Sequence, residues 1–416
     1  MATVAEFDRY MAYLCEGLGH ADRHQSLLDY CSGLMLPIER KSVEPLAAHA
    51  APQNVRAKHQ SLHHFVANSG WSDPVLLERV RAWVEPHLGI RSGTYWIIDD
   101  TGHPKCGTQS VGVARQYCGV LGKRDNCQVA VSLSLASARG SVPIDYQLYV
   151  PQEWFSDAKR RGAVGIPEDL QFATKPQMAL AQICRAHARG VVPGIVLADA
   201  DYGRDRSLRD GVAALGLQYA VAVRADTTVR RAPGQRVVRV EHLAKQLKRS
   251  EWRTVTWREG SNAKLSSRFA RARVRVGERD EEWLLIEWPV GEPEPTRYFL
   301  SNLPAKMPLR SLVNAVKMRW RIEHDYHELK QEFGLSHYEG RGWRGFHHHA
   351  SLCIAAYGFL TADRLKQHSK KNCARPKAPL LPDTYEPRGS RPRATPCSGF
   401  DSDAAPSHLH ADRAAP

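Results

Sequence analysis

Three acidic residues carry the main chemical signal of this sequence: Asp100, Asp199 and Glu323. The first two end short apolar runs typical of buried strands, and the third lies in a stretch with helical periodicity. Neighbouring strands of one sheet can bring such ends together, and a helix packed on that sheet can add the third carboxylate. Three carboxylates in one cleft repel one another unless a cation holds them, and hard oxygen ligands suit Mg²⁺ or Mn²⁺. The trio therefore predicts a site for two divalent ions, which is suited to phosphodiester chemistry.

Charged residues flank the third carboxylate at helical spacing. At about 100° per residue, Arg319, Glu323 and Lys330 share one face of the predicted helix, while Ile322 and Tyr326 belong to a separate apolar stripe. One face is expected to pack and the neighbouring face to present charge. The alternative is an ordinary surface network of small energetic value.

Each of the two strand-end aspartates has a rival close by. Asp99 competes with Asp100, and strand alternation points the two side chains to opposite faces. Asp201 competes with Asp199, its alternative role being a turn or a helix cap. A run of three histidines, at 347–349, is a candidate metal site. Successive side chains point in different directions around a helix, however, which favours a surface role.

The elements that must position these residues follow from periodicity. Residues 1–90 have apolar residues at helical spacing, which predicts a small helical domain. The basic residues between its helices make it a candidate DNA-binding domain. Arg40 and Lys41 lie between its helices, where they could meet phosphates, although a solvated helix face is the alternative.

Residues 91–224 predict a βββαβαβ order, which is a three-layer α/β plan. The expected strands are 95–98, 127–135, 142–150, 194–198 and 219–223, and the expected helices are 176–187 and 205–215. The first three strands are expected to form an antiparallel meander.

The remainder of the chain divides into three segments. Residues 225–305 predict a mainly β, basic insertion, because positions 224–279 hold 16 Lys/Arg against 5 Asp/Glu among β-branched residues and tryptophans. Residues 306–365 predict a long helix at 309–333 and another at 348–365. Residues 366–416 are rich in Pro, Ser, Ala and basic residues, so a disordered tail is expected.

Composition limits the class of protein. The 416 residues carry a formal net charge of +14, which points to a polyanionic partner, and 43% apolar residues suffice for a full-sized core. No apolar run approaches the roughly 18–20 residues that cross a bilayer, and the nine cysteines include no CxxC pair. A soluble, cytoplasmic protein with reduced thiols is expected.

Taken together, the motifs resemble those of the DDE-type transposases of bacterial insertion sequences, in particular the cut-and-paste branch with a β-strand insertion before the final Glu. The resemblance covers about residues 5–365. The motifs that carry it are Ile98-Asp99-Asp100-Thr101-Gly102, Ser110 to Gly119, Asn126-Cys127-Gln128, Ala198 to Gly203, and Arg319 to Glu323 with Lys330. Because the family pattern places the first Asp directly before Thr101, we choose Asp100 as the first ligand.

The resemblance implies an α/β fold: a ribonuclease-H-like, three-layer catalytic core interrupted by a mainly β insertion and preceded by a small helical domain. It implies that Asp100, Asp199 and Glu323 bind the metal pair and that Arg319 and Lys330 hold DNA phosphates. Lys105 is a further candidate for a phosphate contact, with a solvated lysine as the alternative. The family motif has a Tyr where this chain has Val316, so the hydroxyl that makes one terminal phosphate contact in the family is absent here.

An aromatic side chain of the insertion stacks, in that family, on a base flipped out near the transposon end. The candidates here are Trp252, Trp257, Trp283 and Trp288, each of which has a core role as its alternative.

The sequence thus predicts a transposase that uses Mg²⁺ or Mn²⁺ to cleave double-stranded DNA at element ends and to join the ends to target DNA. A homodimer on DNA and a place at the bacterial nucleoid are expected from the resemblance. The competing hypotheses are a catalytically inactive, transposase-derived DNA-binding protein or repressor, and a nuclease of the same fold with another substrate.

Overall fold

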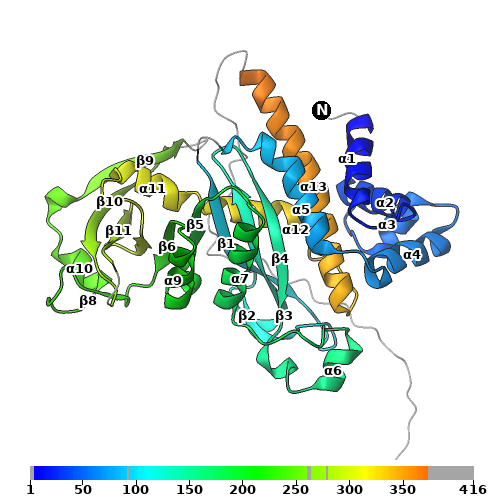
Figure 1. Cartoon of the computed structure of the whole chain (residues 1–416), viewed down its shortest axis with the longest axis horizontal. Helices are drawn as coiled ribbons and strands as arrows, with labels where there is room; N and C mark the ends of the chain where they lie inside the picture. The colour runs from blue at the N-terminus through cyan, green and yellow to red at the C-terminus, as the bar shows by residue number, and fades with distance from the viewer. Residues whose placement is uncertain (1–3, 91–92, 260–263, 278–279, 373–416) are drawn as a thin grey trace, which may run out of the picture. The chain divides into compact units, whose positions relative to one another are not determined.

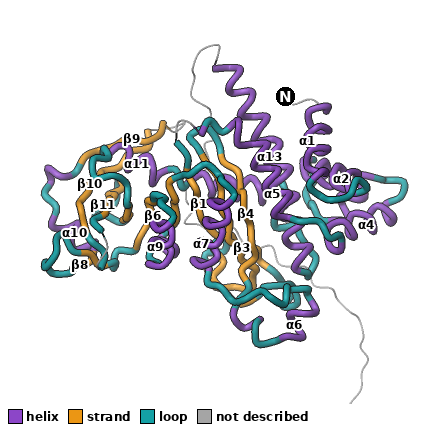
Figure 2. Tube along the Cα trace, viewed as in Figure 1, coloured by secondary structure: helices purple, strands orange, loops and turns teal. Residues whose placement is uncertain are grey.

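The computed structural model describes residues 4–90, 93–259, 264–277 and 280–372. Its N-terminal part is helical (Figures 1 and 2). The helices are α1 (Val4–Glu16), α2 (Arg23–Met35), α3 (Val43–Ala50), α4 (Val55–His63) and α5 (Asp73–Val84). The sequence Ser72-Asp73-Pro74 is typical of a helix start, and α5 begins there: the Ser72 hydroxyl accepts the N–H of Val75 at 3.4 Å as an N-cap.

The central part alternates strands and helices as the sequence predicts. Its elements are β1 (Tyr95–Pro104), β2 (Ala114–Cys118), β3 (Lys123–Ala136), β4 (Ser141–Tyr149), α6 (Ala158–Ala163), α7 (Lys175–Ala188), β5 (Ile195–Ala198), α8 (Ala200–Gly203), α9 (Arg206–Ala214) and β6 (Tyr219–Val223). The expected antiparallel meander is confirmed, since β3 pairs antiparallel with both β1 and β4. Strand β2, which the sequence reading omitted, forms a hairpin with the start of β3.

The following segment is mainly β, as predicted, but its longer strands join the central sheet. They are β9 (Arg253–Glu259), β10 (Lys264–Val274), β11 (Glu282–Pro289) and β12 (Arg297–Ser301), accompanied by β7 (Thr228–Val229), β8 (Val238–Arg239) and α10 (Val240–Gln246). In the described residues the strand order is β2-β3-β1-β5-β6-β12-β11-β10-β9, with β4 also on β3. The β1–β5 and β5–β6 pairs are parallel, and the other pairs along this order are antiparallel.

The predicted helix at 309–333 is two helices, α11 (Leu309–Lys317) and α12 (Trp320–Gln331). Between them the N–H groups of Met318, Arg319, Arg321 and Ile322 bond three residues back, to Ala315, Val316, Met318 and Arg319. This tighter turn interrupts the α-helix, so the expectation of one continuous helix is wrong.

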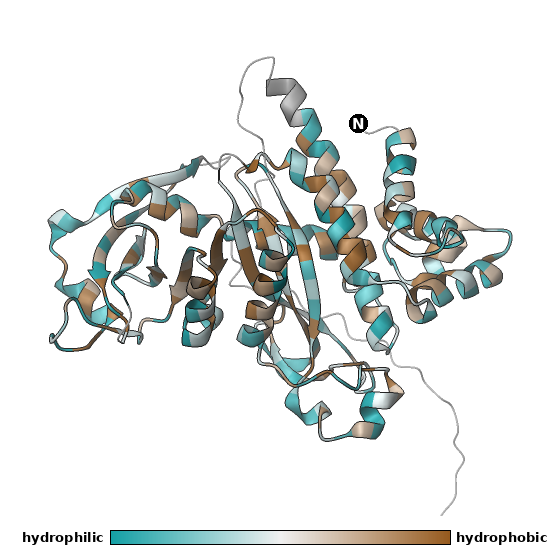
Figure 3. Ribbon diagram, viewed as in Figure 1, coloured by the Kyte–Doolittle hydropathy of each residue, from teal (hydrophilic) through white to brown (hydrophobic). Residues whose placement is uncertain are grey.

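The last described helix is α13 (Trp343–Asn372), which is longer than expected. The prediction of disorder from residue 366 is therefore wrong for 366–372, and 373–416 lie outside the described residues. The helix persists because Leu352, Ile354, Ala362 and Leu365 are buried against the sheet and the N-terminal helices. Figure 3 shows hydrophobic residues along this helix.

Two apolar cores cover opposite faces of the central sheet. One contains Trp96 and Ile98 of β1 and extends to α7, α13 and the N-terminal helices. The other contains Ile97 of β1 and Leu197 of β5 and is covered by α11 and α12. No helix among the described residues is long and apolar enough to cross a membrane.

Candidate active site

Strand register brings the two strand-end aspartates together. In the parallel β1–β5 pair, Ile97 lies opposite Leu197. Continuing that register by two residues sets Asp99 beside Asp199, and the period of two keeps both on the face covered by α11 and α12. Asp99, rather than the expected Asp100, therefore shares this face with Asp199.

Asp199 is held at the point where β5 turns into α8. It is the N-cap of α8, and its Oδ1 accepts the N–H groups of Asp201 at 2.9 Å and Tyr202 at 3.2 Å. The turn needs a glycine at 203, because a Cβ there would lie 1.9 Å from the carbonyl oxygen of Ala222. The Ala198 to Gly203 motif thus fixes the carboxylate, and Asp201 pairs outward with Arg224 at 2.5 Å.

Glu323 reaches the same face from the first turn of α12. Arg319, at the break between α11 and α12, donates to Asp99 Oδ2 at 2.7 Å and also to Glu323 Oε1. We call Asp99, Asp199, Glu323 and Arg319 the carboxylate site. Its side chains are partly accessible, with 14% of Asp99 and 28% of Glu323 exposed.

The pKa shifts of these side chains show that their charges interact strongly. Burial raises the pKa of Asp99 to about 7; Arg319 opposes this shift, and the carboxylates of Asp199 and Asp100 add to it. Burial also raises the pKa of Asp199. Burial would lower the pKa of Arg319, but Asp99, Glu323 and Asp199 together raise it above its usual value. One guanidinium therefore compensates three acids.

Asp100 makes its contacts elsewhere. Its Oδ2 accepts from the Lys175 ammonium at 2.8 Å and from the Tyr202 hydroxyl at 3.2 Å. Lys175 is the first residue of α7, whose N-cap Thr174 forms a capping box with Gln177. Sequence reasoning missed Lys175 and Tyr202, because only the capping signal was visible and not the long-range contact with Asp100.

Two of the three lysines expected to bind DNA, Lys330 and Lys105, lie near the end of β1. Lys330 donates to the carbonyl oxygen of Gly102 at 2.8 Å, and burial lowers its pKa to about 8. Lys105 donates to the carbonyl oxygen of Tyr338 at 2.6 Å, and burial lowers its pKa as well. Both are partly buried, so their phosphate contacts remain predictions.

Lys41 requires a correction. It is 4% exposed and donates to the carbonyl oxygens of Leu34, at 2.6 Å, and Glu332. A lysine used in this way joins two segments and is not presented to a phosphate. Arg40 is exposed and pairs with Glu339, so a phosphate would have to compete with that carboxylate.

The three consecutive histidines also differ from expectation. His347, His348 and His349 are at most 5% exposed. His349 bonds to the carbonyl oxygen of Gly334 at 2.9 Å and to the Tyr30 hydroxyl at 2.8 Å, and the His348 ring stacks on Trp71 at 3.5 Å. His348 and His349 lie in the contact between α13 and the N-terminal part, and His347 accepts the N–H of Leu148 in β4, so the expected surface role is wrong.

The tryptophans of the β-rich segment all have packing partners. Trp252 and Trp288 meet edge to face at 5.3 Å, and Arg268 lies 3.7 Å over the Trp288 ring. Lys317 lies 4.2 Å over Trp257, and Trp283 donates to the carbonyl oxygen of Pro304 at 3.0 Å. Stacking on a flipped base remains a prediction for each.

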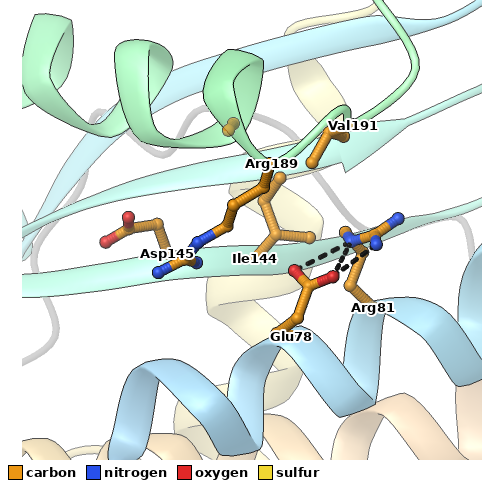
Figure 4. Close-up of a pocket in the computed structure, with 7 residues that line it drawn as sticks. Glu78, Arg81, Ile144, Asp145, Arg189 and Val191 are labelled. Atoms are coloured by element: carbon orange, nitrogen blue, oxygen red, sulfur yellow. Dashed lines mark hydrogen bonds and ion pairs between the residues drawn. The ribbon is translucent and has the colours of Figure 1, made fainter.

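Figure 4 shows a small hollow between α5, β4 and the end of α7, and no residue of the carboxylate site lines it. Its walls are lined by Glu78, Arg81, Ile144, Asp145, Ala186, Arg189 and Val191. Arg81 bonds Glu78 within α5, and Asp145 of β4 accepts from Arg185 of α7 at 3.0 Å, so the second ion pair ties two neighbouring elements together. We assign no reaction to it.

The donor set of the carboxylate site fits hard divalent cations, because it consists of carboxylate oxygens around one positive centre. As they stand, no three or more His, Cys, Asp or Glu side chains in the described ranges form a ready coordination group. Arg319 occupies the position between Asp99 and Glu323 instead.

Comparisons with known proteins agree with this chemistry. The profile described as "DDE superfamily endonuclease" matches residues 13–264, and the profile described as "Transposase DDE domain" matches residues 173–359. A curated relative, described as a probable transposase for insertion sequence element IS701 of Microchaete diplosiphon, is 27% identical over 310 residues, covering 73% of each chain.

Proposed function

This chain belongs to the DDE superfamily of endonucleases, and on that premise we propose that it is an insertion-sequence transposase, which cuts DNA at the ends of its element and joins those ends to target DNA. The observation that carries the proposal is the meeting of Asp99, Asp199 and Glu323 around Arg319.

The sheet supports a ribonuclease-H-like core for this activity. Strands β4, β3 and β1 are antiparallel neighbours, and β5 and β6 continue from β1 in parallel. Strands β9 to β12 come between β6 and α11 in the chain, which supports residues 225–305 as an insertion before Glu323.

We propose that Asp199 and Glu323 hold two Mg²⁺ or Mn²⁺ ions together with a carboxylate of β1. Bound ions of this kind supply a nucleophile at neutral pH and stabilise the leaving oxygen. Asp99 is supported as the third ligand because it shares a face of the sheet with Asp199. Asp100, which the sequence predicted, stays the alternative, because its charge acts on the pKa of Asp199.

Arg319 then has two partners in turn. Without bound ions it neutralises Asp99 and Glu323. When cations take over that charge, the guanidinium becomes available for a phosphate of the DNA end, which it can bind in a bidentate manner. Lys330, on the same face of α12 as Glu323 and about two turns further along, supports a second phosphate contact.

The remaining features of the proposal concern partners. Residues 1–90 are proposed to contact the element ends, with Arg40 as the candidate basic residue that stays exposed. A homodimer bridging two ends, acting in the cytoplasm at the nucleoid, follows from the transposase assignment.

The test uses duplexes that cover the two borders of the element carrying this reading frame. With Mg²⁺ the wild type is expected to cut at the border and to join the new 3′ end to a second duplex. Asp199→Asn and Glu323→Gln are expected to lower cutting by about a thousandfold or more while border binding persists. Asp99→Asn should match them, and Asp100→Asn should retain more activity.

Two outcomes contradict the proposal. A folded wild type that binds the borders without cutting would identify a DNA-binding repressor. Cutting that ignores the border sequence and yields no joined product would identify a nuclease with another substrate.

A further inference from the structure

The hairpin formed by β2 and β3 exposes apolar side chains at its tip. Tyr117 is 57% exposed, Val120 is 57% exposed and Leu121 is 37% exposed. Among the residues that the structure describes, eight large apolar side chains are exposed, and these three lie within five positions. Single exposed apolar residues are normal, but a cluster of them marks an interaction surface.

Positive charge surrounds this apolar tip. Arg115, Lys123 and Arg124 are exposed, and the one acid among these positions, Asp125, pairs with Lys123 at 2.8 Å. In the register of the hairpin, Tyr117 lies opposite Arg124, two positions beyond Arg115, so all three side chains share one face. An aromatic ring between two guanidinium groups suits DNA as a partner. DNA is a polyanion because of its phosphates, and its bases have flat, apolar faces.

The hairpin is also aligned with the carboxylate site. Strand β3 is continuous from Lys123 to Ala136, and its Ser132 lies opposite Asp99. Nine residues separate Ser132 from Lys123, a distance of about 30 Å at ~3.3 Å per residue. This is close to one turn of B-form DNA, about 34 Å.

The hairpin projects beyond its neighbour in the sheet. β1 ends at Pro104, which pairs with Cys127, whereas β2 and β3 continue as a pair to Cys118 and Lys123 (Figure 1). A two-stranded ribbon fits the major groove of B-form DNA, where apolar side chains can contact thymine methyl groups.

We propose that the β2–β3 hairpin binds the major groove of duplex DNA about one helical turn from the cleaved bond. Tyr117, Val120 and Leu121 enter the groove, and Arg115, Lys123 and Arg124 contact the flanking phosphates. The inference rests on the proposed function, because it takes the carboxylate site as the place where the DNA end is cut.

The experiment is a hydroxyl-radical footprint on border duplexes without added Mg²⁺, so that binding is observed without cutting. The test variant combines Tyr117→Ser, Val120→Ser and Leu121→Ser. Protection about 9–10 base pairs from the cleaved bond should disappear, and border affinity should fall about tenfold. The matched control is Val290→Ser, which changes an exposed valine outside the hairpin, and it should leave the footprint unchanged. Val290 is 80% exposed.

A second variant tests the charges. Replacing Arg115, Lys123 and Arg124 with alanine should reduce the slope of log Kd against log salt by about 2–3, since each phosphate contact contributes ~0.9. Tyr117→Phe keeps the ring and should bind like the wild type. Equal melting temperatures establish that the variants fold.

A footprint and salt slope like those of the wild type in both combined variants would overturn the inference. So would a serine variant that binds DNA normally but loses self-association in sedimentation, since the partner would then be a second copy of the chain. The proposed function fails in a different way, through a wild type that shows no preference for border DNA.

Discussion

The carboxylate site and the inner face of α13 both hold buried polar and charged side chains, but these side chains are partnered in opposite ways. At the carboxylate site, Asp99, Asp199 and Glu323 share one guanidinium, that of Arg319. Along α13, Asp325, Lys41 and His347–His349, which we call the α13 seam, are at most 5% exposed. In the seam, neutral hydroxyls, backbone N–H groups and carbonyl oxygens satisfy the polar groups.

The contrast between the seam and the carboxylate site shows that a cluster of buried polar residues can be structural rather than functional. In the seam, Asp325 Oδ1 accepts from Ser141 at 2.6 Å and from Tyr357 at 2.7 Å, so α12 is tied to β4 and α13. Complete partnering of this kind stabilises one arrangement and leaves nothing for a ligand to do. Three carboxylates that share one guanidinium leave an excess of negative charge that metal ions can neutralise, and Arg319 is then available to a phosphate.

The largest expected effect on stability is in the seam. Asp325→Ala removes an acceptor from buried hydroxyls and should lower the free energy of unfolding by about 3–5 kcal/mol, at about 1–3 kcal/mol per unsatisfied group. Urea unfolding measures this loss, which should be the same with and without Mg²⁺. Rescue of the variant by Mg²⁺ would break the distinction between the two regions.

The next largest expected effect is the loss of Arg319 from the carboxylate site. Arg319→Gln leaves crowded acids without their cation, so the free energy of unfolding should fall by about 2–4 kcal/mol, less than for a fully buried pair because the site is partly exposed. Millimolar Mg²⁺ or Mn²⁺ should raise the melting temperature of the variant more than that of the wild type.

The control for that prediction is Arg321→Gln, two positions further along the chain in the first turn of α12. Arg321 donates to the carbonyl oxygen of Ala138 and lies 4.8 Å over Trp320. Its loss should not change the response to Mg²⁺. Equal shifts in all three proteins would mean that Arg319 and cations do not compete.

The smallest effect concerns pH in the seam. Burial lowers the pKa of His349 to about 4. Because the unfolded chain takes up a proton near pH 6.5 and the folded chain does not, stability is complete above pH 6.5 and declines as the pH falls toward 4. At pH 5 the contribution of this residue should be a loss of about 2 kcal/mol.

Unfolding in urea at pH 7.5 and pH 5 measures it. His349→Gln should show a smaller difference between the two pH values than the wild type, and His49→Gln, at an exposed histidine, should behave like the wild type. A His349→Gln variant with the full pH dependence would assign the loss to other groups.

Much of the fold could be predicted because its signals are local. The apolar runs before Asp99 and Asp199 mark strands, the capping residue Ser72 marks a helix start, and Glu323 falls on a helix with Arg319 and Lys330. These patterns act over a few residues, where backbone geometry and side-chain spacing decide the outcome.

The amino-acid sequence by itself determined the order of the elements, the class of chemistry and which segments carry the acids. Only the tertiary structure decided that Asp99 shares a face with Asp199, that Asp100 pairs with Lys175, and that Lys41 and the three histidines are internal. The physical reason is that strand register and helix packing depend on contacts across hundreds of positions. A shift of one residue in register reverses which side chains meet, and no local pattern records it.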